Sequence, residues 1–154
     1  MTSNPLTFWH HHAGISVPDL DASIAWYRDV LGFQLARRYP IDSIPAEVAV
    51  LKNGPLHIEL FQVPDAQPAS PERRIPDQDL HTHGNKHVAF AVADVRTLAE
   101  ELRRRGADIV WVKEFKFGSN AFIRDNSGNL LEFVQGSPPA EPFARLDITR
   151  PEVE

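Results

Sequence analysis

The stretch that decides the fold runs Phe8-Trp-His-His-His-Ala-Gly-Ile-Ser-Val-Pro-Asp19, and its shape returns in Gly84-Asn-Lys-His-Val-Ala-Phe-Ala-Val-Ala-Asp94. Each stretch places a histidine at the head of an apolar run that ends at an aspartate. The two histidines, His12 and His87, are separated by 87 − 12 = 75 positions, and the closing aspartates keep the same offset, 94 − 19 = 75. This repetition predicts that one structural unit occurs twice in the chain.

Composition limits the classes of protein to which the chain can belong. A length of 154 residues with 42% hydrophobic residues is typical of one compact globular domain. The absence of cysteine excludes disulfides, thiolate metal sites and a cysteine nucleophile. No segment approaches the roughly 18 apolar residues of a membrane span, and the N-terminus lacks a basic start. We therefore expect a cytoplasmic protein with no membrane partner. A net charge of −5 with dispersed cations argues against a nucleic-acid partner.

The segments that follow the two stretches have the same predicted order of elements. After the first strand, 8–17, apolar residues from Leu20 to Leu31 recur at helical spacing, with Asp19 or Asp21 as the cap and Gly32 at the end. The second strand, 87–93, precedes a helix capped by Asp94 and closed by Gly106, with Val95, Leu98 and Leu102 on its apolar face. Further short strands are predicted near 33–38, 47–52, 56–62, 108–112, 120–124 and 130–134, with turns at Asn53-Gly54 and at 125–129. Each half therefore reads β-α-β-β-β.

The predicted organisation is a single domain, residues 1–135, with a tail. It comprises a first module at about 7–63, a loop at 64–84 and a second module at about 85–135. The loop contains four prolines and no apolar periodicity, so we expect either a functional lid or a plain linker. The proline-rich tail, 136–154, is expected to wrap a surface, such as that of a partner subunit, or to stay mobile.

The last predicted strand of each half carries a glutamate. Glu59 and Glu132 lie 132 − 59 = 73 positions apart, close to the offset between the histidines. Strand alternation places apolar residues on the opposite face of these strands, and a glutamate on an apolar strand is costly to bury unless it is paired or bound to a metal. The alternative is that the two histidines and two glutamates are surface residues on the solvated face of an antiparallel sheet. The duplicated placement of all four residues favours a divalent metal site.

The other histidines have weaker claims to a function. His10, and His57 two positions before Glu59, are expected on the same concave face, where they either contact substrate or form a polar lining. His11 is expected to point to the opposite side. His81 and His83 lie on the loop and are expected to face solvent.

The segment from His12 to Phe33 resembles the opening of the vicinal oxygen chelate superfamily, and His87–Asp94 and Arg124–Phe133 resemble its later motifs. This superfamily includes glyoxalase I, methylmalonyl-CoA epimerase, bleomycin-resistance proteins and type I extradiol dioxygenases. The resemblance covers about residues 8–135. It implies an α+β fold in which two tandem βαβββ modules form a curved mixed sheet around a metal-binding cleft, with helices on the convex face. It also implies that the metal ligands are His12, Glu59, His87 and Glu132.

These ligands suit one divalent metal ion per site, namely Ni, Co, Mn, Fe(II) or Zn. Such a metal stabilises a developing enolate. By resemblance to glyoxalase I and the epimerase, Glu132 is the candidate catalytic base and Glu59 its partner. We therefore expect a glyoxalase-like isomerase, epimerase or lyase that acts on a small substrate with vicinal oxygens through an enediolate-like intermediate. Arg124 could anchor a substrate carboxylate or form an ordinary salt bridge at a strand end.

Two other activities stay open within the superfamily. An Fe(II)-dependent extradiol dioxygenase of a catechol-type substrate would use two histidines and one glutamate, so a ligating Glu59 favours the non-redox alternative. A non-catalytic drug-binding protein would resemble the bleomycin-resistance members, which lack the four ligands. No signature for glutathione or coenzyme A is evident. Because the concave sheet and the proline-rich tail invite pairing, we expect a homodimer.

Overall fold

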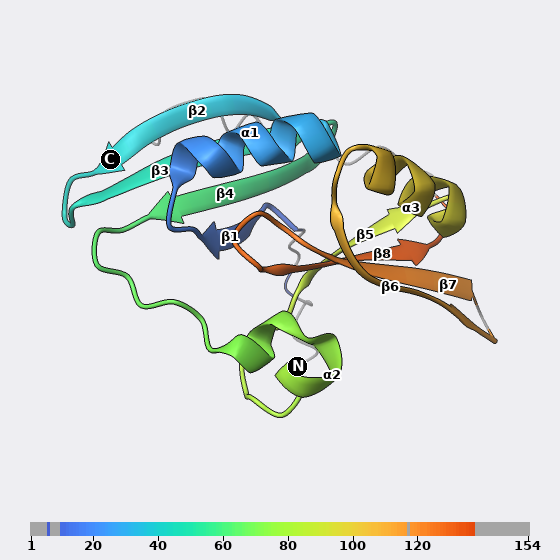
Figure 1. Ribbon diagram of the computed structural model, residues 1–154. Helices are drawn as coiled ribbons and strands as arrows, with labels where there is room; N and C mark the ends of the chain where they lie inside the picture. The colour runs from blue at the N-terminus through green and yellow to red at the C-terminus, as the bar shows by residue number, and fades with distance from the viewer. Residues whose placement is uncertain (1–5, 7–9, 117, 138–154) are drawn as a thin grey trace, which may run out of the picture.

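The computed structural model, described for residues 6, 10–116 and 118–137, contains two successive βαβββ units (Figure 1). The first unit consists of β1 (Ala13–Ser16), α1 (Leu20–Leu31), β2 (Gln34–Ile41), β3 (Ala46–Asn53) and β4 (Leu56–Gln62). The second consists of β5 (Val88–Val92), α3 (Val95–Arg104), β6 (Asp108–Phe115), β7 (Gly118–Arg124) and β8 (Leu130–Gln135). The predicted order of elements is confirmed. The first predicted strand, 8–17, is shorter in the structure: residues 10–12 precede it, and residues 7–9 lie outside the described part.

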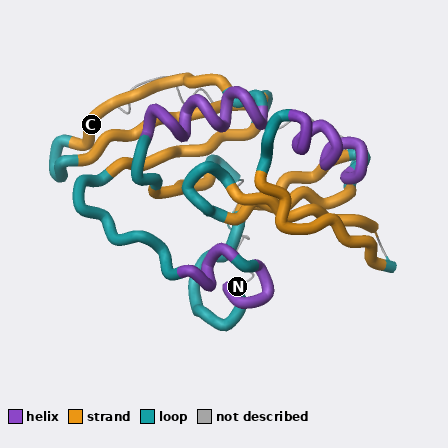
Figure 2. Tube along the Cα trace, in the orientation of Figure 1, coloured by secondary structure: helices purple, strands orange, loops and turns teal. Residues whose placement is uncertain are grey.

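Each unit forms its own four-stranded mixed sheet. The strand orders are β1-β4-β3-β2 and β5-β8-β7-β6, and in both sheets the first strand runs parallel to the last. Figure 2 shows the two sheets diverging from each other, with a helix lying along one face of each. The α+β class with tandem modules is thus confirmed, and the curved sheet is made in this chain from two separate sheets.

Aspartate caps begin both long helices, as the sequence predicts. The Asp19 side chain accepts a hydrogen bond from the Ala22 backbone N–H at 2.9 Å, and Asp94 accepts one from Thr97 N–H at 3.0 Å. Gly32 ends α1 with a left-handed φ of 74°, a conformation that glycine adopts without steric cost. These contacts fix the position at which the chain turns from the histidine-bearing segment into the helix.

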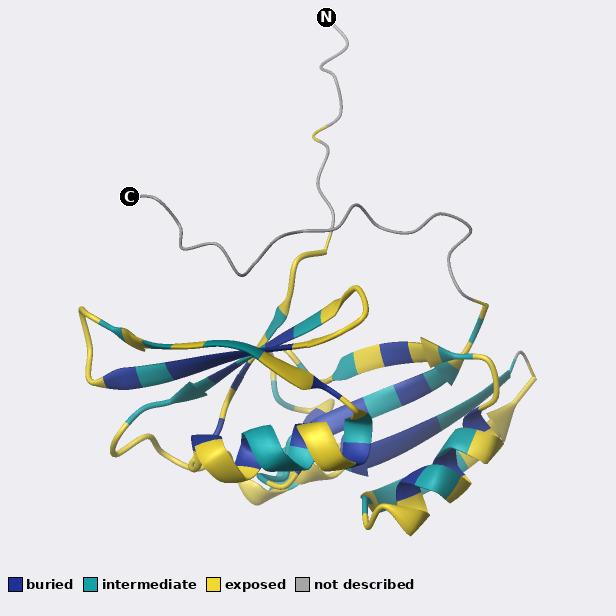
Figure 3. Ribbon diagram, turned by 90° about the horizontal axis from the view of Figure 1, so that it is seen from above, coloured by how far each residue is buried: buried dark blue, intermediate teal, exposed yellow. Residues whose placement is uncertain are grey.

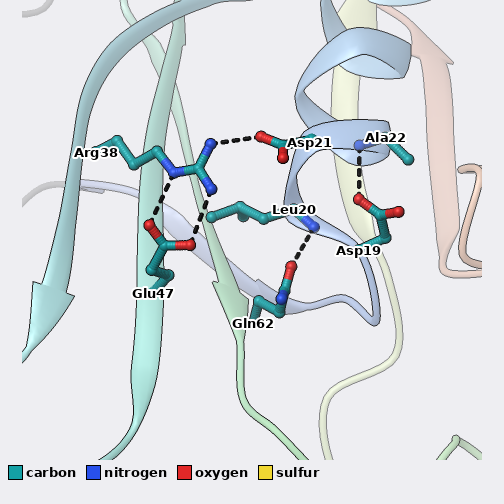
Figure 4. A network of polar contacts seen from close by, with 7 residues as sticks. All are labelled: Asp19, Leu20, Asp21, Ala22, Arg38, Glu47 and Gln62. Carbon is teal, nitrogen blue, oxygen red and sulfur yellow. Dashed lines mark hydrogen bonds and ion pairs between the residues drawn. The ribbon is translucent and has the colours of Figure 1, made fainter.

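The start of α1 is also tied to its own sheet (Figure 4). Arg38 on β2 donates to Asp21 of the helix at 2.5 Å and to both carboxylate oxygens of Glu47 on β3. The Gln62 side chain, at the end of β4, accepts a hydrogen bond from Leu20 N–H at 2.6 Å. The helix is therefore anchored to β2, β3 and β4, the last of which carries the first glutamate.

One hydrophobic core spans both modules. Many strand residues of both sheets are buried, as Figure 3 shows by colour. The cluster joins Ile58 of the first sheet to Ile123 and Leu131 of the second. At the junction the rings of Phe33 and Phe90 lie 6.2 Å apart. The sheet faces that carry the glutamates are therefore the faces turned away from the shared core.

The connection between the modules is more ordered than the sequence indicates. Within the segment 64–84, where a loop or linker is expected, a 3-10 turn, η1 (Pro71–Arg74), and a short helix, α2 (Pro76–Asp79), form. Asp79 explains this order: it is only 1% exposed and forms ion pairs with Arg73 at 2.9 Å and Lys86 at 3.4 Å. A buried carboxylate needs such partners, so these two cations fix the segment.

The proline-rich tail falls outside the described residues from 138 onward, and so does the role expected for it. Within the described part, no helix is long and apolar enough to cross a membrane.

Candidate metal centre and active site

Each module brings its predicted histidine and glutamate into direct contact. His12 Nε2 lies 3.1 Å from Glu59 Oε2, and His87 Nε2 lies 3.0 Å from Glu132 Oε2. The strand pairing explains the match: Gly14 is opposite Glu59 in the first sheet and Ala89 is opposite Glu132 in the second. Both glutamates are largely shielded, with 17% and 15% of the side chain exposed. The duplicated sequence thus builds the same donor pair twice.

A further side chain holds the second oxygen of each glutamate. The Tyr39 hydroxyl donates to Glu59 Oε1 at 2.8 Å, and the Asn120 amide donates to Glu132 Oε1 at 2.7 Å. Burial raises the pKa of Tyr39, and its hydrogen bond to Glu59 acts in the same direction, which keeps the hydroxyl protonated as a donor. Both carboxylates are consequently oriented toward their histidines.

The expected separation of faces is confirmed around both pairs. In β1 and β5 the residues beside the histidine-bearing face are small and exposed, whereas Ile15 and Phe90 on the other face are buried. In β4 and β8 the neighbours of the glutamates, such as Ile58 and Leu131, are likewise buried. Small side chains next to the pairs leave room for a ligand on the face turned away from the core.

The two pairs do not meet within the chain. Among the described residues, no three histidine or carboxylate side chains cluster closely enough to hold a metal ion. Both His12 and His87 nevertheless line one cleft of about 1440 Å³, together with the connection 62–69 and the turn 127–130. The four predicted ligands therefore form two separate His–Glu pairs, one in each module.

The chain matches the family described as the Glyoxalase/Bleomycin resistance protein/Dioxygenase superfamily over residues 9–133, which is most of its length.

The chain belongs to this superfamily.

Individual relatives in the superfamily are distant. A 2-epi-5-epi-valiolone epimerase of Actinomyces sp. is 32% identical over 60% of this chain and 56% of its own length. A lactoylglutathione lyase of Arabidopsis thaliana is 30% identical over 88% of this chain and 47% of its own length. The chain thus spans about half the length of these two curated relatives. The crystal structure of a glyoxalase family protein from Enterococcus faecalis superposes with a TM-score of 0.69 at 22% identity, covering 82% of this chain and 96% of that one, which shows the shared fold.

The donor set fits the divalent metal that glyoxalase superfamily members typically use. Two imidazoles and two carboxylates are ligands that borderline divalent ions accept. The hydrogen bonds from Tyr39 and Asn120 are the kind of outer contact that orients metal-ligating carboxylates. The fit is to two half-sites, each with one histidine and one glutamate.

The histidines predicted to contact substrate lie at the edge of the first half-site. His10 is exposed and lines the cleft. His57 stacks on His11 with ring centroids 6.4 Å apart, and burial lowers the His57 pKa, with further lowering from the charges of His11 and Lys52. The expectation that His11 points to the opposite side is wrong, because its Nδ1 lies 2.5 Å from His12 Nδ1 and its ring stacks on His57. Residues 10–12 precede β1, so strand alternation does not govern them. Substrate contact by His10 and His57 stays a prediction.

Arg124 has structural partners in this chain. Its Nη1 donates to Asp108 at 3.1 Å, and its Nε donates to the Arg74 carbonyl at 2.8 Å. These bonds join β7 to the start of β6 and to the connection between the modules. A role in binding a substrate carboxylate stays a prediction.

Sequence reasoning missed Tyr39, Asn120 and the residues of β6 on the glutamate face. Tyr39 and Asn120 reach the glutamates diagonally across the sheets, so neither shares a motif with the residue that it orients. The two residues are not at equivalent positions of the modules, so the repeat gives no signal for them. On β6, Trp111 lies opposite Phe122, which lies opposite Glu132, so one row across the sheet carries an aromatic wall beside the glutamate.

Proposed function

We propose that this protein is a divalent-metal-dependent enzyme of the glyoxalase type, an isomerase, epimerase or lyase. Its substrate would be a small molecule with oxygens on neighbouring carbons. The observation that carries the proposal is the pair of equivalent His–Glu contacts, each with the second glutamate oxygen held by a further donor. The epimerase and lyase relatives support the same reaction class.

In this proposal His12, Glu59, His87 and Glu132 hold one divalent ion. When bound, that ion supplies Lewis acidity toward the substrate oxygens. Glu132 removes the proton α to the substrate carbonyl and returns it, and Glu59 faces the substrate from the other side. Tyr39 and Asn120 keep the two carboxylates in position, and the small residues of β1 and β5 leave space for the substrate.

We further propose that a second copy of the chain completes the site. Within one chain the helices and the core lie between the modules, and the glutamate-bearing faces turn away from that core. A homodimer can place the first-module face of one copy against the second-module face of the other. Such pairing unites two half-sites into four ligands and forms two sites per dimer.

Glu59 and Glu132 have equivalent contacts, which favours a glyoxalase-type reaction over the ring cleavage of a dioxygenase. An extradiol dioxygenase would need only one of them as a ligand. Here Glu59 has a histidine contact and an orienting donor, as Glu132 does. A ligating Glu59 therefore favours the non-redox reaction.

Metal analysis of the purified protein tests the proposed centre. We expect about one divalent ion per chain, with loss of the ion in both His12→Ala and Glu132→Ala because each removes one of the ligands. His81→Ala removes an exposed histidine of the connection that is not one of the proposed ligands, and it serves as a control that keeps its metal. Full metal content in His12→Ala and Glu132→Ala would refute the centre.

Isotope exchange tests the reaction class. In D₂O we expect deuterium to enter the α position of an accepted α-hydroxy ketone or of a compound after which the relatives are named, without oxygen uptake. Glu132→Gln should abolish this exchange. Oxygen consumption that depends on a catechol and Fe(II) would instead assign the protein to the dioxygenases.

A further inference from the structure

A lysine held over an aromatic ring stands on the same sheet face as the second half-site. Lys113 Nζ lies 3.5 Å from the centroid of the Trp111 ring, a cation–π geometry. Trp111 packs edge-to-face on Phe122 at 5.2 Å, and Phe122 packs on His87 at 4.9 Å. A continuous line of rings therefore runs from the lysine to the metal-ligand candidate.

The strand register places the lysine next to the glutamate row. Trp111, Phe122 and Glu132 lie opposite one another on β6, β7 and β8. Farther along β6, Lys113 lies opposite Asn120, whose amide donates to Glu132. Asn120 thus lies between Lys113 and the proposed base, Glu132, and Lys113 is on the sheet face that carries Glu132.

Lys113 differs from the other cations near it in lacking an anionic partner. Arg96 pairs with Glu114, and Arg124 pairs with Asp108 at 3.1 Å. Glu114 follows Lys113 directly in β6 but lies on the opposite face of the strand, because side chains alternate. Within the described part of the chain, Lys113 makes no hydrogen bond or ion pair. Its side chain is exposed and available to an anion.

The first module carries a matching pair at the equivalent positions. Arg37 lies over the Tyr39 ring at 4.4 Å from the centroid. The offsets are 111 − 37 = 74 and 113 − 39 = 74, within one position of those between the histidines and between the glutamates. Both pairs follow a β-bulge, at Leu35/Arg37 and at Ile109/Trp111, which aims them at the glutamate face. Cation and aromatic residue have exchanged places, yet each module keeps one of each.

We propose that Lys113, positioned by Trp111, binds the anionic group of the substrate, so that the substrate is a small organic carboxylate or phosphate ester with vicinal oxygens. This inference rests on the proposed function, because it assigns the substrate class of that same site. A lysine on this face adds a positive charge near the proposed site, which attracts an anionic group of the substrate. In the proposed dimer, Arg37 of one copy and Lys113 of the other border the same four ligands.

Three related compounds test the proposal with the intact, metal-loaded protein. Dihydroxyacetone, hydroxypyruvate and dihydroxyacetone phosphate share a hydroxyl group beside a ketone, and they carry no anion, a carboxylate and a phosphate respectively. Calorimetry should show at least one anionic compound binding about 10-fold more tightly than dihydroxyacetone, the size of one charge-assisted hydrogen bond. The tighter of the two anionic compounds identifies carboxylate or phosphate as the natural group.

Substitutions test whether the preference for anionic compounds depends on Lys113. Lys113→Met should remove the preference for the anionic compound, whereas Lys113→Arg should retain it because the charge is kept. Arg103→Met removes an exposed cation from α3, on the other side of the sheet, and should leave the preference unchanged. The indole N–H resonance of Trp111, assigned by its loss in Trp111→Phe, should shift on binding in the wild type.

The outcomes separate the two proposals. Equal binding of all three compounds, no binding of either anion, or an unchanged preference in Lys113→Met would overturn the role of Lys113, even if metal content and proton exchange are as expected. A protein that discriminates anions through Lys113 but contains no metal would refute the proposed function and leave the anion site standing.

Discussion

The Tyr27 hydroxyl donates a 3.0 Å hydrogen bond to Oδ2 of Asp125, a contact that joins α1 of the first module to the turn between β7 and β8 of the second. Both residues are buried, with 0% and 4% of their surface exposed. The turn leads directly into the strand that carries Glu132. This bond therefore couples the helix of one half to the position of the proposed base in the other.

Removing this hydroxyl should destabilise the fold. In Tyr27→Phe the carboxylate of Asp125 keeps its bonds from Ser127 and Asn129 but loses its partner across the module junction. We expect the free energy of unfolding to fall by about 1–2 kcal/mol, measured by urea denaturation. Trp26→Phe, at the neighbouring and less buried position, is the comparison. An unchanged midpoint for Tyr27→Phe would show that the bond contributes nothing net.

The same pair gives a prediction for alkaline pH. Burial raises the pKa of Tyr27 well above its ordinary value, and the charge of Asp125 raises it further. Above about pH 10 the unfolded chain loses this proton while the folded chain retains it, so stability declines with rising pH. The advantage of the wild type over Tyr27→Phe should be complete below about pH 10 and shrink above it. Urea denaturation of both proteins at about pH 8 and about pH 11, on either side of the ordinary tyrosine pKa, would test this, and an equal difference at the two values would contradict it.

Two glycines with the same backbone conformation distinguish the cost of backbone strain from the cost of a steric clash when each is replaced by alanine. Gly128 and Gly106 have φ values of 88° and 80°, so alanine is strained at both. A Cβ at Gly106 meets nothing within 4 Å, whereas one at Gly128 would overlap the Arg74 guanidinium, which donates to the Ser127 carbonyl. Gly128→Ala should therefore cost about 1 kcal/mol more than Gly106→Ala in thermal unfolding. Similar losses for both variants would show that Arg74 adapts freely.

Mixing two inactive variants tests the shared site. If the ligands come from two copies, a hybrid dimer of His12→Ala and His87→Ala contains one intact site and one doubly impaired site. Refolding an equal mixture should restore metal binding to about a quarter of the wild-type value, since half of the dimers are hybrids with one good site of two. Each variant refolded alone is the control. No recovery in a mixture that forms dimers would place all four ligands within one chain.

The donors behind the glutamates should tune metal affinity without abolishing it. Tyr39→Phe and Asn120→Ala each leave the four ligands intact but release one carboxylate oxygen. Loss of such an outer hydrogen bond typically lowers metal affinity by roughly 10-fold. Competition with a chelator would measure it, with Gln34→Ala on the exposed start of β2 as control. Unchanged affinity in both variants would mean that these bonds do not orient ligands.

The sequence predicts the repeated module well because its signals are local. Asp19, Gly32 and Asp94 are recognised from their immediate neighbours, and they cap or end helices as expected. The spacing of His12, Glu59 and their counterparts predicts one histidine and one glutamate at matching places in each module. The structure adds that the first and last strands pair in parallel, which brings each histidine to its glutamate.

What the sequence does not indicate depends on long-range geometry. The order of the connection comes from the burial of Asp79 between two cations, which no periodicity reveals. The partners Tyr39 and Asn120 follow from strand register, and the separation of the two half-sites follows from how the modules pack. The direction of His11 is not predictable from strand alternation, because that residue lies before the start of β1.

The separate sheets have a consequence for assembly. In the described part of the chain, all strand pairing lies within one module or the other. There the modules touch through side chains, such as Tyr27 on Asp125 and Arg105 on the Val30 carbonyl. The same contact between a first and a second module can form within one chain or between two chains, because every copy carries both surfaces. The connection between β4 and β5 then acts as a tether: it sets the effective concentration against which any second copy must compete.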